Sequence, residues 1–95
     1  MDALVVDNRA LLRVSASSSA ASVAAAVSHA VYDGKSVTLR AIGAAAVNQA
    51  IKAIAIAQSF VGARGLVLAT RPGFVTVTMP DAKEVSAIEL KVFTV

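Results

Sequence analysis

The sequence predicts one two-layer α+β domain, in which a four-stranded mixed sheet carries two helices on one face. Two observations give this fold class. Segments of strand and helix character follow one another in the order β-α-β-α-β-β, and the hydrophobic period changes from helical spacing to two residues in the last third of the chain. The chain has 95 residues, the length of a single domain with one core. We expect that domain at residues 11–95, preceded by an N-terminal leader at residues 1–10.

The first strand and helix are expected at residues 11–32. Residues 11–16 (LLRVSA) alternate polar and apolar side chains as a half-buried strand does. The serines at 17–19 provide helix caps, because a hydroxyl accepts a hydrogen bond from an unpaired N–H of the first turn. The helix extends from about Ala20 to Tyr32, and Gly34 permits the left-handed conformation that closes a helix.

A second strand and helix repeat this arrangement. The strand is expected at residues 36–42 (SVTLRAI), Gly43 allows a tight turn, and the helix continues to about Phe60. The two units align weakly at an offset of about 27 residues, so that Leu12-Arg13 matches Leu39-Arg40, although an alanine-rich sequence produces such matches by chance. Consecutive βα units give parallel neighbouring strands with both helices on one face.

The C-terminal third is rich in strand formers. Residues 66–71 (LVLATR) and 74–79 (FVTVTM) are separated by Pro72 and Gly73, which predicts a bend or bulge in one long strand. A turn then leads into a final strand at residues 85–95 (VSAIELKVFTV). That strand has few charges, so we expect an edge strand that could pair with another copy of the chain.

The second helix is apolar around most of its circumference, and its polar residues fall in one narrow sector. The sheet and one short helix cannot cover so much apolar surface, so we expect at least a homodimer with this helix near the interface. The polar stripe contacts a ligand, an RNA or a symmetry mate, or it is a solvated strip; two of its amides alternatively pair across the interface. The predicted interface or ligand residues are Asn48, Gln49, Ile51, Ile54 and Phe60.

The composition excludes several classes of function. With 57% hydrophobic and 16% charged residues the chain is not a disordered protein, and without cysteine it has no disulfide or thiol nucleophile. His29 is the only histidine and lacks metal-ligand partners, and the glycines form no phosphate-binding loop. The serines at 15–19 have no identifiable base. We therefore expect no enzyme activity, no metal and no cofactor.

The net charge of +3 permits an anionic partner without requiring one. Apolar runs are interrupted by Asn48, Gln49 and Lys52 before about 18 residues, and the N-terminus lacks the features of a secretory signal. We expect a cytoplasmic protein with no membrane contact.

The chain resembles the bacterial stage V sporulation protein S family over residues 11–93. The resemblance is carried by RVSASSSAASVA, AIGAAAVNQAIKAIAIAQSFV, RPGFVTV and SAIELKV, and its most specific part is the second of these, at residues 41–61. That family is similar to the Alba group of chromatin and RNA-binding proteins, which share the β-α-β-α-β-β order and form dimers. The resemblance implies an Alba-like fold and a cytoplasmic, non-enzymatic dimer linked to sporulation or development, with nucleic-acid binding inferred from the fold.

The sequence departs from these relatives where they carry cations. Family members commonly have a lysine in the loop where this chain has Ser17–Ser19, and Alba proteins place arginines where Ile42 and Ala44 flank Gly43. If the chain binds phosphates, other cations must contact them. The predicted nucleic-acid-binding residues are Arg13, Arg40, Lys52, Arg64 and Arg71.

Two functions follow from these observations. The first is a nucleic-acid-binding regulator that contacts the phosphate backbone of DNA or RNA as a dimer; in that case the five cations act together, whereas otherwise they are scattered surface charge. The alternative is a structural protein that self-assembles into homo-oligomers or filaments without nucleic acid.

Overall fold

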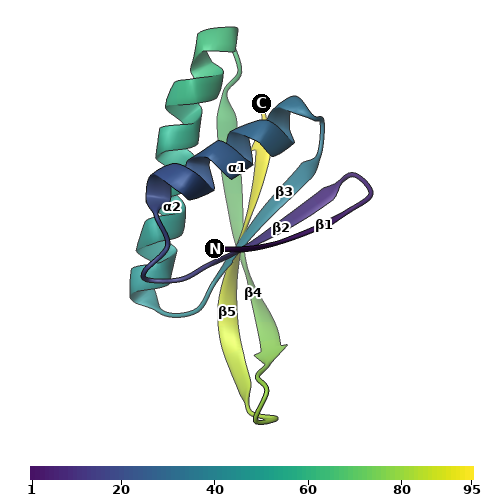
Figure 1. Ribbon diagram of the computed structural model, residues 1–95, viewed down its shortest axis with the longest axis vertical. Helices are drawn as coiled ribbons and strands as arrows, with labels where there is room; N and C mark the ends of the chain where they lie inside the picture. The colour runs from purple at the N-terminus through teal and green to yellow at the C-terminus, as the bar shows by residue number, and fades with distance from the viewer.

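The computed structural model describes residues 1–95 (Figure 1). Its elements are, in chain order, β1 (Asp2–Val6), β2 (Arg9–Val14), α1 (Ala20–Tyr32), β3 (Ser36–Ala41), α2 (Ala44–Val61), the short 3-10 helix η1 (Gly62–Arg64), β4 (Leu68–Thr78) and β5 (Glu84–Thr94). The α+β class with two helices and a mixed sheet is confirmed. The sheet, however, has five strands, not four.

The strands are ordered β1-β2-β3-β5-β4, and only β2 and β3 are parallel neighbours. Strands β3 and β4 each run antiparallel to β5, so they share one direction. The connections β2-α1-β3 and β3-α2-β4 therefore both join parallel strands, and both move the same way across the sheet. Because such crossovers are right-handed, the two helices fall on the same face. The opposite face carries no helix.

The register of the parallel pair agrees with the internal repeat. Arg13 lies opposite Arg40 and Leu12 opposite Leu39, which is the same pairing that the 27-residue offset gives. The helix positions that correspond at this offset, Val27 and Ile54, are both buried in the core.

The additional strand lies in the segment expected to be a leader. Residues 2–6 form β1, which pairs antiparallel with β2 through a turn at Asp7 and Asn8, with Asp7 in the left-handed region at φ 55°. Every residue of β1 is exposed. A strand with neither face buried needs no alternation of polar and apolar residues, so DALVV lacks the period-two pattern. The signals that it does carry are the β-branched Val5 and Val6 and the two-residue turn Asp7-Asn8.

The final strand is not at an edge of the sheet, and that prediction is wrong. β5 lies between β3 and β4, and its residues Leu90 and Val92 are buried in the core. The crossover through α2 places β4 two positions from β3, and β5 fills the gap between them. The free edges of the sheet belong to β1 and β4.

The bulge predicted at Pro72 and Gly73 is absent. The register of β4 with β5 continues without interruption from Leu68 to Thr78, with Pro72 opposite Leu90. Proline has no N–H to donate, and β4 tolerates it because one side of this strand is unpaired.

The core is built from small aliphatic side chains. Helix α2 presents a row of alanines, spaced three or four residues apart, to α1 and the sheet, and their small size allows close approach. Valines of α1 and the central residues of β2 and β3 complete the cluster, with Leu39 wholly buried. The buried residues of α2 are Ala46, Ala50, Ala53, Ile54, Ala57 and Val61.

The helical segment Ala44–Arg64 is long and apolar enough, by length and composition alone, to cross a membrane. The count of uninterrupted apolar residues missed this segment, because Asn48, Gln49 and Lys52 interrupt the run but leave its mean hydropathy high. In the structure the segment is the core helix of the domain, with α1 and the sheet packed against it.

Replacing Leu39 tests the position of the core. Leu39→Ala should lower the free energy of unfolding by about 2–5 kcal/mol, because it leaves a cavity under both helices. Urea-induced unfolding followed by circular dichroism measures the loss, at one protein concentration for all variants. Val95→Ala, at a side chain that is 76% exposed, should change the same quantity by less than about 0.5 kcal/mol. Equal losses in the two variants would contradict this core.

Candidate nucleic-acid interface

The face of the sheet without helices carries most of the cations. Since Leu12, Leu39 and Leu90 point into the core, residues one position away point to the opposite side. The register then places the cations of four strands on one surface: Arg13 lies opposite Arg40, and Arg71 opposite Lys91. The open-face cations are Arg9, Arg13, Arg40, Arg71 and Lys91.

This face holds an excess of positive charge equal to the net charge of the chain. Five of the nine lysines and arginines lie on it, but only two of the six acidic residues, Asp2 and Glu89. The excess is therefore three positive charges, and the charges on the remaining surface cancel. A modest net charge is thus concentrated on a single face, where it can attract an anion far better than dispersed charge would.

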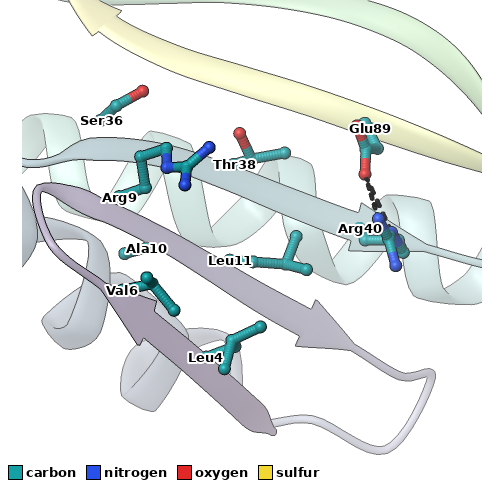
Figure 2. A pocket seen from close by; sticks show the side chains of 9 residues that line it. All are labelled: Leu4, Val6, Arg9, Ala10, Leu11, Ser36, Thr38, Arg40 and Glu89. Atoms are coloured by element: carbon teal, nitrogen blue, oxygen red, sulfur yellow. Dashed lines mark hydrogen bonds and ion pairs between the residues drawn. The ribbon is translucent and has the colours of Figure 1, made fainter.

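The two acidic residues pair with two of the arginines. Asp2 of β1 accepts from Arg13 at 2.6 Å, and both side chains are largely exposed. Glu89 of β5 accepts from Nη2 of Arg40 at 2.7 Å and from Nε at 2.9 Å (Figure 2). The Arg40 and Glu89 side chains are only 23% and 21% exposed, so this second pair is shielded from water. Arg13 and Arg40 consequently have part of their charge neutralised within the chain.

The other three cations of this face make no salt bridge. Arg71 and Lys91 occupy directly opposed positions on β4 and β5. Like charges at such positions repel, which costs stability. Arg9 begins β2, beside Ser36 of β3. These three side chains have charge available for an external anion.

The structure divides the predicted basic set. Arg13, Arg40 and Arg71 come together on the open face, whereas Lys52 and Arg64 belong to the helical side. Lys52 is exposed on α2, and the Arg64 guanidinium lies 4.1 Å from the centroid of the Tyr32 ring. A cation over an aromatic ring is attracted by it, so Arg64 already has an intramolecular partner.

Two open-face cations are missing from the predicted set. The alternation of the last strand places Lys91 beside Glu89 on its polar side, and a hairpin centred near Asp81 is the signal that would have placed it opposite Arg71. Arg9 falls in the segment expected to be a leader. Its spacing of four residues from Arg13, with apolar residues between them, is the signal that would have placed both on one face of a strand.

The polar stripe of α2 is only partly free. The Gln49 amide donates to the carbonyl of Ser18 at 2.8 Å, which ties α2 to the loop before α1. Asn48 is exposed, but Ile54 is buried in the domain's own core and contributes nothing to the outer surface.

The loop before α1 uses its serines for capping, as the sequence indicated. Ser19 is the N-cap residue of α1, and its hydroxyl accepts from the Ser22 N–H at 3.2 Å. The buried Ser18 hydroxyl accepts from the Ser15 N–H at 2.9 Å. The loop therefore supports the start of the helix with hydroxyls.

An apolar groove lies on the helical side, between α2 and the β4-β5 hairpin. Its lining includes Ile51 and Phe74, which are 45% and 84% exposed, and Val47 and Ile88 beneath them. Phe60 is also exposed, nearer the end of α2. The uncovered part of α2 is thus continuous with an exposed aromatic side chain of β4.

The two ion pairs should differ in strength because they differ in burial. A double-mutant cycle with Arg40→Ala and Glu89→Ala should give a coupling energy of about 1–2 kcal/mol, between the values for exposed and buried pairs. The cycle with Arg13→Ala and Asp2→Ala should give less than about 0.5 kcal/mol, because water screens that pair. Urea-induced unfolding provides both measurements. A stronger coupling for the outer pair would contradict the assigned burial.

Comparison with known protein families identifies the family of this chain. The profile of the family described as stage V sporulation protein S (SpoVS) matches residues 10–95. The match includes both helices and all strands except β1, and it begins at the second residue of β2. The chain therefore belongs to the stage V sporulation protein S family, which implies a sporulation-related role.

Proposed function

We propose that the protein is a cytoplasmic, non-enzymatic regulator of sporulation or development that binds the phosphate backbone of a nucleic acid as a dimer. The observation that carries this proposal is the concentration of the net positive charge on the helix-free sheet face. Nucleic-acid affinity that does not depend on sequence comes from neutralised phosphates, and a cationic face supplies the necessary charge.

The opposed Arg71 and Lys91 give this proposal a local basis. Two like charges on neighbouring strands destabilise the sheet, and no acidic side chain of the chain neutralises them. A bound phosphate removes this repulsion. The pair therefore lowers the stability of the free domain and favours the binding of an external anion.

The groove that Ile51 and Phe74 line supports the proposal of a dimer. Phe74 is 84% exposed, which is unusual for a phenylalanine in a monomeric domain of this size. A second copy that covers the groove buries apolar area from both chains and leaves the cationic face of each chain open. The assembly then presents two cationic faces, each with an excess of three charges.

The alternative, self-assembly without nucleic acid, is favoured by the free edge of β4. This strand has 11 residues, and the backbone groups on its outer side are unpaired. An open edge of that length is a template for strand addition from another copy. Assembly through the edge alone requires no polyanion and no steep salt dependence, so binding measurements separate the two functions.

Removing the unpaired charges tests nucleic-acid binding. Arg71→Gln/Lys91→Gln should weaken binding to labelled duplex DNA and to RNA strands and flatten the salt dependence, by about one in the logarithmic slope for each phosphate that the variant no longer neutralises. Fluorescence anisotropy across a salt series provides the measurement. The variant should stay folded, since the substitution removes a repulsion.

The matched control is Lys52→Gln/Arg64→Gln, which removes the same number of charges from the helical side. It should retain most of the affinity and the slope of the parent protein. Equal weakening by both double variants would contradict the assignment to the sheet face. If the parent protein shows no salt-sensitive binding, self-assembly becomes the better account.

Phe74→Ser tests the dimer. This substitution should convert the sedimentation profile from a dimer to a monomer of about 10 kDa at micromolar concentration, because it removes the most exposed apolar side chain of the groove. Phe93→Ser, on the opposite face of the sheet, is the control and should leave the dimer intact. A parent protein that sediments as a monomer would contradict the proposal.

A further inference from the structure

A shallow pocket on the open face combines apolar, hydroxyl and cationic side chains. It has a volume of about 330 Å³. Figure 2 shows Leu4, Val6 and Leu11 on the β1 and β2 side of the pocket, and Arg9 and Thr38 over β2 and β3. Both helices lie behind the sheet in this view, so the pocket opens away from them.

The register explains how this combination arises. Leu4, Leu11 and Thr38 are opposite one another across β1, β2 and β3, and the same row continues to Lys91 of β5. The adjacent row on this face places Val6 opposite Arg9 and Arg9 opposite Ser36. An apolar surface is therefore bordered by a cation on two sides, Arg9 along β2 and Lys91 beyond Thr38. Neither of these cations makes a salt bridge within the chain.

The apolar residues that β1 contributes lie outside the hydrophobic core. Leu4 and Val6 are 49% and 45% exposed and face away from the core. The phosphates of a duplex match the cations of this face, but the planes of its bases are stacked inside the helix and cannot reach Leu4 or Val6. An unpaired base offers an apolar plane directly beside its own phosphate. The pocket likewise has an apolar surface directly beside a cation, so it can contact the base and the phosphate of one nucleotide together.

We infer that this pocket binds one unpaired nucleotide of a single-stranded nucleic acid. The base packs on Leu4, Val6 and Leu11, the flanking phosphates contact Arg9 and Lys91, and the hydroxyls of Ser36 and Thr38 are available to the polar edges of the nucleotide. The inference rests on the proposed nucleic-acid binding and specifies its substrate as single-stranded. The strand β1, which contributes Leu4 and Val6, lies outside the residues that the family profile matches.

The test compares two labelled strands of equal length that differ only in their bases. One is oligothymidylate, and the other is an abasic strand with the same number of phosphates. The parent protein should bind oligothymidylate about fivefold more tightly or better, which needs the burial of only about 40 Å² of apolar surface at about 25 cal/mol per Å². Leu4→Ser and, independently, Leu11→Ser should bring the two affinities together. The control Val5→Ser changes a neighbouring β1 residue of similar exposure on the other face and should keep the preference.

Three results would contradict the proposed nucleotide pocket. A parent protein that binds both strands equally overturns the nucleotide pocket but leaves phosphate binding intact. A preference that survives in both Leu4→Ser and Leu11→Ser also overturns it, because the bases then contact another surface. Absence of binding to either strand, and to duplex DNA and RNA, refutes the proposed function and the pocket together. Circular dichroism confirms that each variant is folded, and Leu11→Ser keeps the test valid if Leu4→Ser loosens β1.

Discussion

The same-face position of the two helices is the constraint on which the rest of the structure depends. The parallel crossovers from β2 to β3 and from β3 to β4 are right-handed and move in one direction, so α1 and α2 cannot lie on opposite faces. One side of every strand is therefore packed, and the other side meets water. The charged side chains of β2, β3 and the middle of β4 and β5 are confined to that second side, because the first side is packed against the helices.

A core of alanine and valine is what allows two helices to cover a sheet this closely. Side chains such as Ala50, Ala53 and Val27 contribute little area each, so the core depends on short distances between layers. Helix α2 also has an uncovered side, where its Ile51 is exposed beside Phe74 of β4. The helix is therefore more apolar than its own domain can bury.

Much of this arrangement was predictable because it is local. Alternation separates Arg13 from Leu12, the glycine and serine positions mark the helix ends, and the repeat offset gives the register of Arg13 with Arg40. The order of the strands was not predictable in this way, since nothing in the final segment shows that it inserts between β3 and β4. The same is true of β1, whose exposed residues carry no pattern that burial would impose.

The two errors in strand assignment also explain why the site could be only partly predicted. Without β1 the sequence offers no partner for Arg13, so its ion pair with Asp2 could not be foreseen. With β5 at an edge, next to β4 alone, Glu89 would not lie opposite Arg40, and that ion pair could not form. The order of the strands therefore determines which cations are neutralised and which are free. The residue types alone do not determine it.

The acidic residues of the open face have a consequence for selectivity. Asp2, Arg13, Arg40 and Glu89 form one row across β1, β2, β3 and β5, with the two acids at its ends. The repulsion between the adjacent arginines is thereby balanced inside the protein, and that row needs no ligand to be stable. The next row, which leads from Leu4 through Thr38 to Lys91 and Arg71, has no acid and keeps its charge for a partner. A polyanion that approaches this face is consequently drawn to the second row, where its phosphates meet unpaired cations and its bases, if they are unpaired, meet the apolar residues of β1 and β2.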